Sequence, residues 1–450
     1  MKKTPKIKVF ETFAGIGSQH KALQILKENK YLDYEISATS EWDMWANISY
    51  NAIHHHNKNI ASNLSDQEIN DFLLKFHHSN DSKELAKPEF VLKQTRQVRE
   101  MLYSSIINAN NLGSILNITG KQLVEQTKGG VDLITYSFPC QDLSMAGKNK
   151  GMKKGDETRS GLLWQIERII NELDKLNKLP RYLLLENVMN MIQSQHKEQY
   201  LEWMNFLNQK GYETKTYNLN AADFGIPQKR KRIFALSVFK GESQKTKIDS
   251  EVIVFNDIKD ISKNLAIDKK IEDLLKVDYQ NKTQYQEAKD SIPNRTPSRE
   301  KMYFKNDLLH SFEKEQSERF KNFQKYKSNQ YITEKNIRTI TTKQDRHPNS
   351  GVINLKGSKL AREEENLFYQ NDKKQKANYR FLTPRETFLF MGFSDEDFDQ
   401  VLKAKKIINK NTQHKKLNNI VLYRQSGNSI AVNILVAIFN EITKKENRHD

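Results

Sequence analysis

Short apolar runs alternate with amphipathic segments over the first half of the chain. Residues 7–13, IKVFETF, are predicted to form a buried strand, the turn AGIGS follows, and 19–29 has the apolar spacing of a helix. A second strand is predicted at 34–42. Three further apolar runs begin or end at polar residues: 131–138, 181–188 and 232–239. Such runs, separated by helical segments, are typical of parallel strands covered on both faces, so the pattern predicts a doubly wound α/β sheet.

The rest of the chain departs from this rhythm. Within a first domain at 1–249, residues 62–110 are polar and helical in pattern and are interpreted as an insertion. Residues 250–378 are charged and rich in Asn and Lys, which predicts a separate domain with irregular β structure. An ordered helical pattern returns at 379–422. Residues 423–450 are predicted to be a loop leading into an apolar helix that packs back on the first domain.

Charge favours a polyanionic partner. Lys and Arg number 73 against 56 acidic residues, a net charge of +17, and nucleic acid is the first candidate. An AT-biased genome, which enriches Lys, Asn and Ile, would explain the same excess. One cysteine allows no intrachain disulfide and suits a reducing interior. Since no 18-residue apolar run and no N-terminal signal pattern occur, we expect a cytoplasmic protein without a membrane span.

The first motif, FETFAGIGS, places Gly15 and Gly17 between a strand and a helix, where a ligand can approach the backbone. A dinucleotide fingerprint requires a third glycine at the position of His20. Glu41, at the end of the next strand, is placed to accept hydrogen bonds from ribose hydroxyls, and Trp42 can stack on a purine. The set favours a nucleoside without pyrophosphate, S-adenosylmethionine, although a Gly-rich turn with an acid also occurs by chance in many folds.

The single cysteine, Cys140, follows an apolar strand and Pro139. A lone cysteine is most often a small buried hydrophobe. However, the carboxyl end of a strand is where α/β folds place their chemistry, and a proline-stiffened turn suits the presentation of a nucleophile. A nearby positive charge favours the reactive thiolate. Polar groups lie at the ends of two other predicted strands: Glu186, Asn187, Arg230 and Arg232.

Eight short motifs extend this set over nearly the whole chain: FAGIGS (13–18), EW (41–42), FPCQDLS (138–144), TRSGLLW (158–164), ENV (186–188), QKRKR (228–232), RFLTPRE (380–386) and GNS (427–429). In content and order they resemble the DNA cytosine-5 methyltransferases of bacterial restriction–modification systems. The resemblance implies a Rossmann-like methyltransferase domain with a smaller, mixed, irregular β-containing target recognition domain. It also implies site-specific methylation of duplex DNA, without a metal, by a monomer that acts separately from any cognate restriction endonuclease.

The resemblance implies covalent catalysis on a cytosine flipped out of the duplex. Cys140 attacks C6, Glu186 bonds or protonates N3, and C5 takes the methyl group, leaving S-adenosylhomocysteine. Glu186 then requires a raised pKa in a closed site. Arg232 is expected to contact the base O2 or orient Glu186, and Arg230 to hold phosphate near the thiol. Two members of the implied catalytic set are equally compatible with ordering the turns: Asn187 and Gln141.

For the cofactor, the resemblance implies that Phe13 faces the adenine, Gly15 and Gly17 the methionine part, and Glu41 the ribose. Family members often carry an acid at the place where this chain has Ser114. The full implied set is Phe13, Gly15, Gly17, Glu41, Trp42, Ser114, Pro139, Asn428 and Ser429.

DNA contacts are expected on two segments. The Gly- and Lys-rich stretch 144–161, part of a catalytic loop at about 141–161, resembles a mobile loop that closes over DNA, or is an ordinary flexible loop. The stretch 338–351 has side chains suited to base edges, or is a polar hairpin. The candidates are Ser144, Lys148, Arg159, Arg338, Thr341, Thr342, Gln344 and Arg346. The histidines at 54–56, 77 and 78 have no metal-ligand spacing, so no metal is expected.

Two alternatives accompany this interpretation. An RNA cytosine methyltransferase of the transfer-RNA-modifying branch shares the motifs, but that branch is compact and lacks a region like 250–378. A catalytically inactive DNA-binding homologue would not be expected to retain PCQ, ENV and QKRKR together.

Overall fold

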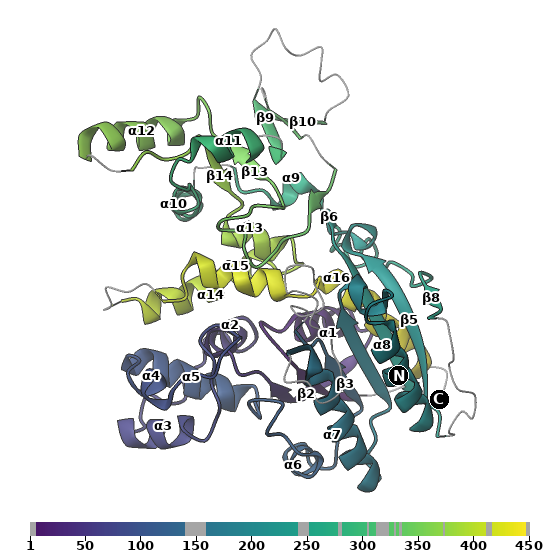
Figure 1. Ribbon diagram of the computed structural model, residues 1–450. Coiled ribbons are helices and arrows are strands. Elements are labelled where there is room, and N and C mark those ends of the chain that lie inside the picture. The colour runs from purple at the N-terminus through teal and green to yellow at the C-terminus, as the bar shows by residue number, and fades with distance from the viewer. Residues whose placement is uncertain are drawn as a thin grey trace.

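A seven-stranded mixed sheet forms the centre of the larger, lower part of the molecule (Figure 1). The computed structural model describes residues 6–139, 159–241, 252–277, 281–303, 306–311, 324–327, 330–332, 335–371, 374–410 and 416–446. In spatial order the strands are β2 (Asp33–Ser40), β1 (Lys6–Thr12), β3 (Leu133–Tyr136), β4 (Tyr182–Asn187), β7 (Lys231–Phe239), β5 (Tyr212–Asn220) and β8 (Val254–Phe255). The predicted strands β1 to β4 and β7 are confirmed.

One expected direction is wrong. Strands β2, β1, β3 and β4 are parallel, but β7 runs antiparallel to both β4 and β5. The sequence pattern does not distinguish the two directions, because β7 is as apolar as a parallel strand buried on both faces. Strand β5 is absent from the expected elements because YETKTYNLN mixes exposed polar with buried residues and carries no apolar run.

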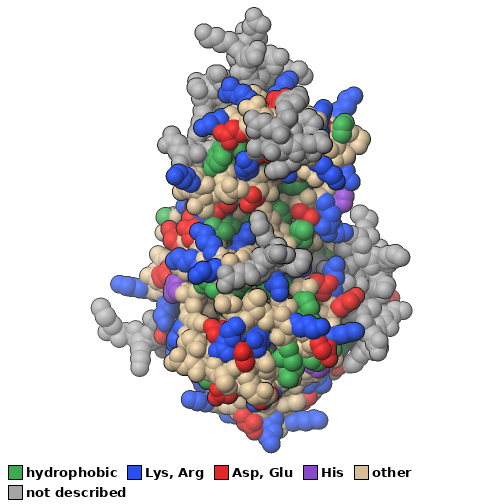
Figure 2. All heavy atoms as spheres, turned by 90° about the vertical axis from the view of Figure 1, so that its left-hand side faces the viewer, with side chains coloured by type: hydrophobic (Ala, Val, Ile, Leu, Met, Phe, Trp, Pro, Cys, Tyr) green, Lys and Arg blue, Asp and Glu red, His purple; other side chains and the backbone are tan. Residues whose placement is uncertain are grey.

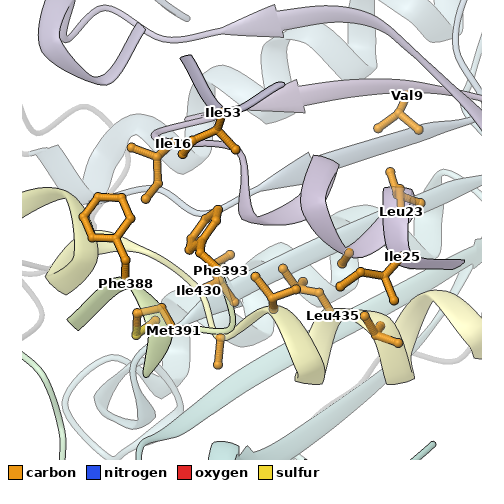
Figure 3. Packing of buried hydrophobic residues seen from close by; sticks show 14 of the residues in the cluster. Val9, Ile16, Leu23, Ile25, Ile53, Phe388, Met391, Phe393, Ile430 and Leu435 are labelled. Atoms are coloured by element: carbon orange, nitrogen blue, oxygen red, sulfur yellow. The ribbon is translucent and has the colours of Figure 1, made fainter. Parts of the chain in front are cut away.

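Both faces of the sheet are covered, as the doubly wound fold requires. Neighbouring strand residues point to opposite sides: Val9 and Leu184 belong to one core, Phe10 and Leu183 to the other. The first core includes residues from α1 (Ser18–Glu28), α2 (Met44–His55), α14 (Asp395–Ile408) and α16 (Val432–Glu446), and Figure 3 shows its close packing. The second core includes residues from α6 (Gly120–Gln126), α7 (Leu163–Lys175) and α8 (Lys197–Gln209).

The region interpreted as an insertion is helical and packs on the lower part. Its helices are α3 (Asp66–Leu73), α4 (Pro88–Leu92) and α5 (Arg96–Asn108). Helix α5 contacts α2, and Val98, Leu102 and Ile106 lie in the first core. Among the described residues of this part, short 3-10 helices lie at Arg159–Leu162, Met189–Ile192 and Ala221–Phe224. No helix in the described ranges is long and apolar enough to cross a membrane.

A smaller part lies above the main sheet in Figure 1 and has its own small cores. Its elements are α9 (Ile271–Leu274), α10 (Lys282–Asp290), α11 (Pro297–Tyr303), β9 (Leu309–Ser311), β10 (Gln324–Lys327), β11 (Gln330–Ile332), β12 (Ile337–Arg338), β13 (Val352–Asn354), α12 (Lys359–Asn371) and β14 (Tyr379–Phe381). The chain does not leave the main sheet at residue 249, because β8 pairs with β5 and Ile258, Ile261 and Leu265 pack in the first core.

Helices α13 (Pro384–Leu389) and α15 (Asn419–Asn428) lie between the two parts (Figure 1). Residues 423–428 were expected to be a loop, but they complete α15. The helix is favoured because the Asn418 side chain accepts a hydrogen bond from the Val421 N–H and so caps its first turn. The chain then turns at Ser429 into α16, which packs on α1.

Candidate active site

The carboxyl end of β4 carries a carboxylate beside a guanidinium. Glu186 Oε1 lies 3.3 Å from Arg232 Nε, and their side chains are 12% and 17% exposed. The antiparallel register pairs Glu186 with Phe234 and Asn187 with Ile233, so the start of β7 lies beside the end of β4. Burial raises the pKa of Glu186, while the charges of Arg232 and Arg230 oppose the increase. The expected raised pKa of Glu186 is confirmed.

Asn187 ties this strand end to the turn that precedes the cysteine. Its buried amide donates to the Phe138 carbonyl at 3.2 Å, and its Oδ1 accepts from the Val188 N–H at 2.8 Å. Both contacts order backbone, which favours the turn-ordering interpretation of Asn187 over a reactive one. Four expected site residues lie outside the described residues: Cys140, Gln141, Ser144 and Lys148. Pro139 is half-buried at the edge of the described chain, and of Arg159 only the backbone is described.

Arg230 does not face a phosphate site. Its side chain is buried, 2% exposed, and donates to the carbonyls of Ile340 at 3.0 Å, Gly427 at 3.1 Å and Ser429 at 2.7 Å. The expectation that Arg230 holds phosphate near the thiol is therefore wrong in this arrangement. The physical reason is the break between two strands: Arg230 lies between β6 (Gln228–Lys229) and β7, so its side chain does not follow the alternation that places Arg232 beside Glu186.

The candidate cofactor loop leaves the carboxyl end of β1. Phe13, Gly15 and Gly17 all have positive φ, at 51°, 55° and 82°. A Cβ at Gly17 would lie 2.1 Å from His54 Nε2, whereas a Cβ at Gly15 would meet nothing closer than 3.9 Å. Gly17 is thus required by packing as well as conformation, while the space beside Gly15 is free for a ligand.

Glu41 faces this loop from the end of β2. Its Oε2 accepts from the Gly15 N–H at 2.9 Å, and its Oε1 accepts from the N–H groups of half-buried Trp42 and of Asp43. Burial, assisted by the negative charge of Asp43, raises the pKa of Glu41 to about 7, and the backbone N–H groups oppose the increase. A carboxylate with a glycine loop on one side is the donor and acceptor set that a ribose diol requires, so these residues fit the nucleoside of S-adenosylmethionine.

Two other segments border the same loop. Ser114 is 8% exposed and follows Gly113, whose carbonyl accepts from the Ser40 hydroxyl at 2.8 Å. From the chain's end, the Ser429 hydroxyl lies 2.6 Å from that of Ser18, the first residue of α1. Asn428 is exposed beside it. The structure therefore brings together the expected cofactor residues from four distant stretches of sequence.

The expected DNA-reading residues of 338–351 divide into two groups. Arg338 and Arg346 are exposed, and Thr341 and Thr342 are half-buried. Gln344 is fully buried, and both polar atoms of its amide lack a hydrogen-bond partner. The expectation that Gln344 reaches a base edge is wrong here, because the turn in which the Arg346 N–H donates to the Lys343 carbonyl directs residue 344 inward. Figure 2 shows Lys and Arg side chains over the full height of one face, interspersed with Asp and Glu.

Comparison with known proteins decides the family. The family model for the C-5 cytosine-specific DNA methylases matches residues 91–444. The chain belongs to this family. The methylase is 32% identical over 443 residues to the orphan methyltransferase M.SssI of Spiroplasma monobiae, covering 98% of both chains. It is 31% identical over 445 residues to the type II methyltransferase M2.ScrFI of Lactococcus lactis subsp. cremoris, covering 98% of this chain and 100% of the relative.

Solved structures confirm the fold. The methyltransferase EhMeth of Entamoeba histolytica superposes with a TM-score of 0.52 at 16% identity, covering 98% of this chain and 99% of that one. A DNMT2 from Spodoptera frugiperda superposes with a TM-score of 0.51 at 17% identity over 97% and 99% of the two chains. The methylase therefore has the Rossmann-like α/β fold of methyltransferases, and its family uses S-adenosylmethionine as methyl donor. In the described ranges no three His, Cys, Asp or Glu side chains form a group that could hold a metal ion.

Several residues that build this site are absent from the set that the sequence predicts. Asn111 is buried and binds both backbone groups of Glu41. Its Oδ1 accepts from the Glu41 N–H at 3.1 Å, and its Nδ2 donates to the Glu41 carbonyl at 2.9 Å. A second group lies behind the glycine loop, where buried Glu11 accepts from the Tyr50 hydroxyl at 2.9 Å and His20 Nδ1 lies 2.8 Å from that hydroxyl. The only sequence signal was position: Asn111 directly precedes the segment with Ser114, and Glu11 precedes the glycine loop.

Proposed function

We propose that this enzyme transfers a methyl group from S-adenosylmethionine to C5 of one cytosine within a short duplex DNA site, with Cys140 as nucleophile and Glu186 as the N3 partner. The observation that carries the proposal is the Glu186–Arg232 pair at the carboxyl end of β4, with Asn187 tying that end to Phe138, two residues before Cys140. This arrangement supports a cytosine ring bound between the thiol and the carboxyl group.

The residue roles follow from the chemistry of the ring. Attack of the Cys140 thiolate on C6 places negative charge on the N3 side, and a neutral Glu186 donates a proton or a hydrogen bond there. Burial raises the pKa of Glu186 and so favours the form that carries this proton. Arg232 Nε lies 3.3 Å from the Glu186 carboxylate and so holds it in orientation. S-adenosylmethionine, when bound, supplies the electrophilic methyl group.

On the cofactor side, Glu41 orients the ribose, and Gly15 gives the backbone close access. Asn111 fixes Glu41, and Ser114 presents a hydroxyl where a carboxylate is common in the family. After methylation, removal of the C5 proton and departure of the thiol restore the aromatic ring and free Cys140. Gly15, Glu41 and Glu186 lie at or just after the carboxyl ends of β1, β2 and β4, which form one edge of the sheet.

We also propose that the upper part of the region 250–378 reads the target site, and that the enzyme acts as a single chain on duplex DNA. One relative is named a type II methyltransferase and another an orphan methyltransferase. Protection of DNA in a restriction–modification system, with a separate endonuclease, is the biological role we propose.

The test is transfer of tritium from labelled S-adenosylmethionine to duplex DNA and, in parallel, to transfer RNA. We expect label in DNA only, and no label with Cys140→Ala. DNA containing 5-fluorocytosine should trap a covalent adduct with the wild type but not with Cys140→Ala. Label in transfer RNA alone would establish the RNA alternative, and activity retained in Cys140→Ala would exclude the covalent mechanism. Bisulfite sequencing of plasmid from expressing cells identifies the site.

A further inference from the structure

The recognition segment, residues 338–344, and the end of α15 at 427–429 meet at one point between the two parts of the molecule. Gly427 allows this contact, because a Cβ there would lie 2.4 Å from the Thr342 nitrogen and 2.5 Å from the Thr341 carbonyl carbon. No side chain fits between the two backbones. Movement of either segment therefore changes the position available to the other.

Two side chains of the QKRKR motif hold this contact. Gln228 Oε1 accepts from the Ile340 N–H at 3.0 Å, and Arg230 donates to the Ile340 carbonyl at 3.0 Å, so both backbone groups of one recognition-segment residue are bound by the catalytic part. The same Arg230 guanidinium donates to the carbonyls of Gly427 and Ser429. Arginine suits this task because its planar fork presents several donors in fixed directions and stays charged.

The end of α15 at 427–429 also contacts the cofactor loop. The hydroxyls of Ser429 and Ser18 lie 2.6 Å apart in a buried contact, and Ser18 directly follows Gly17. A continuous set of contacts thus runs from Ile340 through Arg230 and Ser429 to the loop proposed to hold S-adenosylmethionine.

The recognition segment contains a buried polar group that favours a change of arrangement. The fully buried Gln344 amide has no hydrogen-bond partner, and an unpaired buried amide disfavours the arrangement that contains it. A DNA-bound arrangement that gives this amide a partner would displace the neighbouring residues 340–342. Arg230 binds the carbonyl of Ile340, and the backbone of the next two residues lies against Gly427.

Building on the proposed function, we propose that Arg230 is a positioning residue that couples target-DNA binding to cofactor binding, by holding the recognition segment and the end of α15 at 427–429 in one fixed relation. Linkage makes this coupling reciprocal: the factor by which DNA tightens cofactor binding equals the factor by which cofactor tightens DNA binding. The role is distinct from contact with substrate, since Arg230 is buried and bound to backbone.

The experiment measures the coupling factor directly. Calorimetry gives the Kd of S-adenosylhomocysteine for the full chain, alone and with a short duplex carrying the site found by bisulfite sequencing. The coupling factor is the Kd without the duplex divided by the Kd with it. We expect a factor in the usual range of about 5- to 150-fold for the wild type. Arg230→Lys keeps the charge but loses the planar set of guanidinium donors, so its coupling factor should fall close to one. Gly427→Ala should have the same effect with Arg230 intact.

Arg96→Lys is the matched control. Arg96 also donates to two carbonyls, those of Ala61 and Leu64, but in the helical insertion. The coupling factor of Arg96→Lys should equal that of the wild type. Ser18→Ala removes one hydroxyl and is a mild variant for the case in which Arg230→Lys and Gly427→Ala do not fold; it should lower the factor partially.

A wild-type factor of one, or an unchanged factor in folded Arg230→Lys, Gly427→Ala and Ser18→Ala, would overturn the coupling role. Those outcomes leave tritium transfer by the wild type intact. Failure of the proposed function appears instead as a wild type that transfers no label to duplex DNA, so the two failures are distinguishable.

Discussion

The Arg232 guanidinium lies 3.3 Å from the Glu186 carboxylate because β7 runs antiparallel to β4. In a parallel arrangement the first residues of β7 would lie at the opposite edge of the sheet, a strand's length from the ends of β1 and β4. One reversed strand therefore completes the proposed active site.

Removal of the Glu186 proton donor should abolish most activity. Glu186→Gln keeps the shape but cannot give up a proton, and loss of general acid catalysis lowers kcat by about 10²–10⁴-fold. Tritium transfer under saturating substrate measures the change. The control is Glu198→Gln, at an exposed carboxylate in the first turn of α8, which should retain the wild-type rate. A Glu186→Gln enzyme with wild-type kcat would exclude the proposed role.

Removal of the neighbouring charge should shift a pH profile. Arg232→Met deletes a positive charge that opposes the raised pKa of Glu186, so this pKa should rise further. The limb of the kcat–pH profile that reports loss of the Glu186 proton should then move to higher pH, together with a lower kcat. If this limb of the kcat–pH profile does not shift, the charge of Arg232 does not influence the pKa of Glu186.

Stability should depend on pH through Glu11. Burial raises its pKa from 4.5 to about 8, so between these values the folded state binds more protons than the unfolded state. Stability then falls as pH rises, by at most about 1.4 kcal/mol per pH unit. Glu11→Gln should remove the part of the slope that Glu11 contributes, measured as the free energy of unfolding in urea. The raised pKa of Glu41, about 7, leaves a slope of the same sign below that pH.

The window above pH 6.5 is the most informative for Glu11. Burial lowers the pKa of His20 from 6.5 to about 3, which makes stability rise with pH below 6.5 and partly cancels the Glu11 effect there. The exposed Glu28→Gln variant is the control and should keep the wild-type slope. An identical slope in Glu11→Gln would show that Glu11 does not titrate in this window.

Gly17→Ala should destabilise the cofactor loop more than conformation alone explains. The new Cβ would lie 2.1 Å from His54 Nε2 at a φ of 82°. Gly241→Ala is matched, since its φ is 78° with nothing within 4 Å, and should cost only about 1–2 kcal/mol. Urea unfolding of both variants compares the two costs. Equal costs would mean that His54 moves aside without penalty.

Breaking the buried Arg380–Glu386 pair should strongly destabilise the fold. Both side chains are fully buried and lie 2.8 Å apart, so Arg380→Met leaves an unpaired carboxylate and should cost about 3–5 kcal/mol. Arg346→Met, which breaks the pair between the exposed Arg346 guanidinium and half-buried Asp345, should cost at most about 1 kcal/mol. Comparable free energies of unfolding for the two variants would contradict this expectation.

Local patterns were sufficient for much of the fold and the site. Strands β1 to β4 and β7 follow from their apolar runs, and Glu186 and Glu41 follow from polar residues at strand ends. Strand β5 is not predicted because exposed Glu213 and Lys215 interrupt its buried residues, so the sequence shows no continuous apolar run there. The α15 residues 423–428 were not found because Gly427 and Asn428 are typical of loops.

The sequence by itself determined the element types, the family resemblance and the positions at which reactive side chains occur, because these depend on neighbouring residues. Only the tertiary structure decided that β7 is antiparallel, that Arg230 binds three carbonyls and that Gln344 is buried. An apolar run is equally apolar in either direction, and a polar side chain does not reveal its distant partner. Those choices are made by contacts between residues far apart in the chain, such as Arg230 with Ile340 and Ser429.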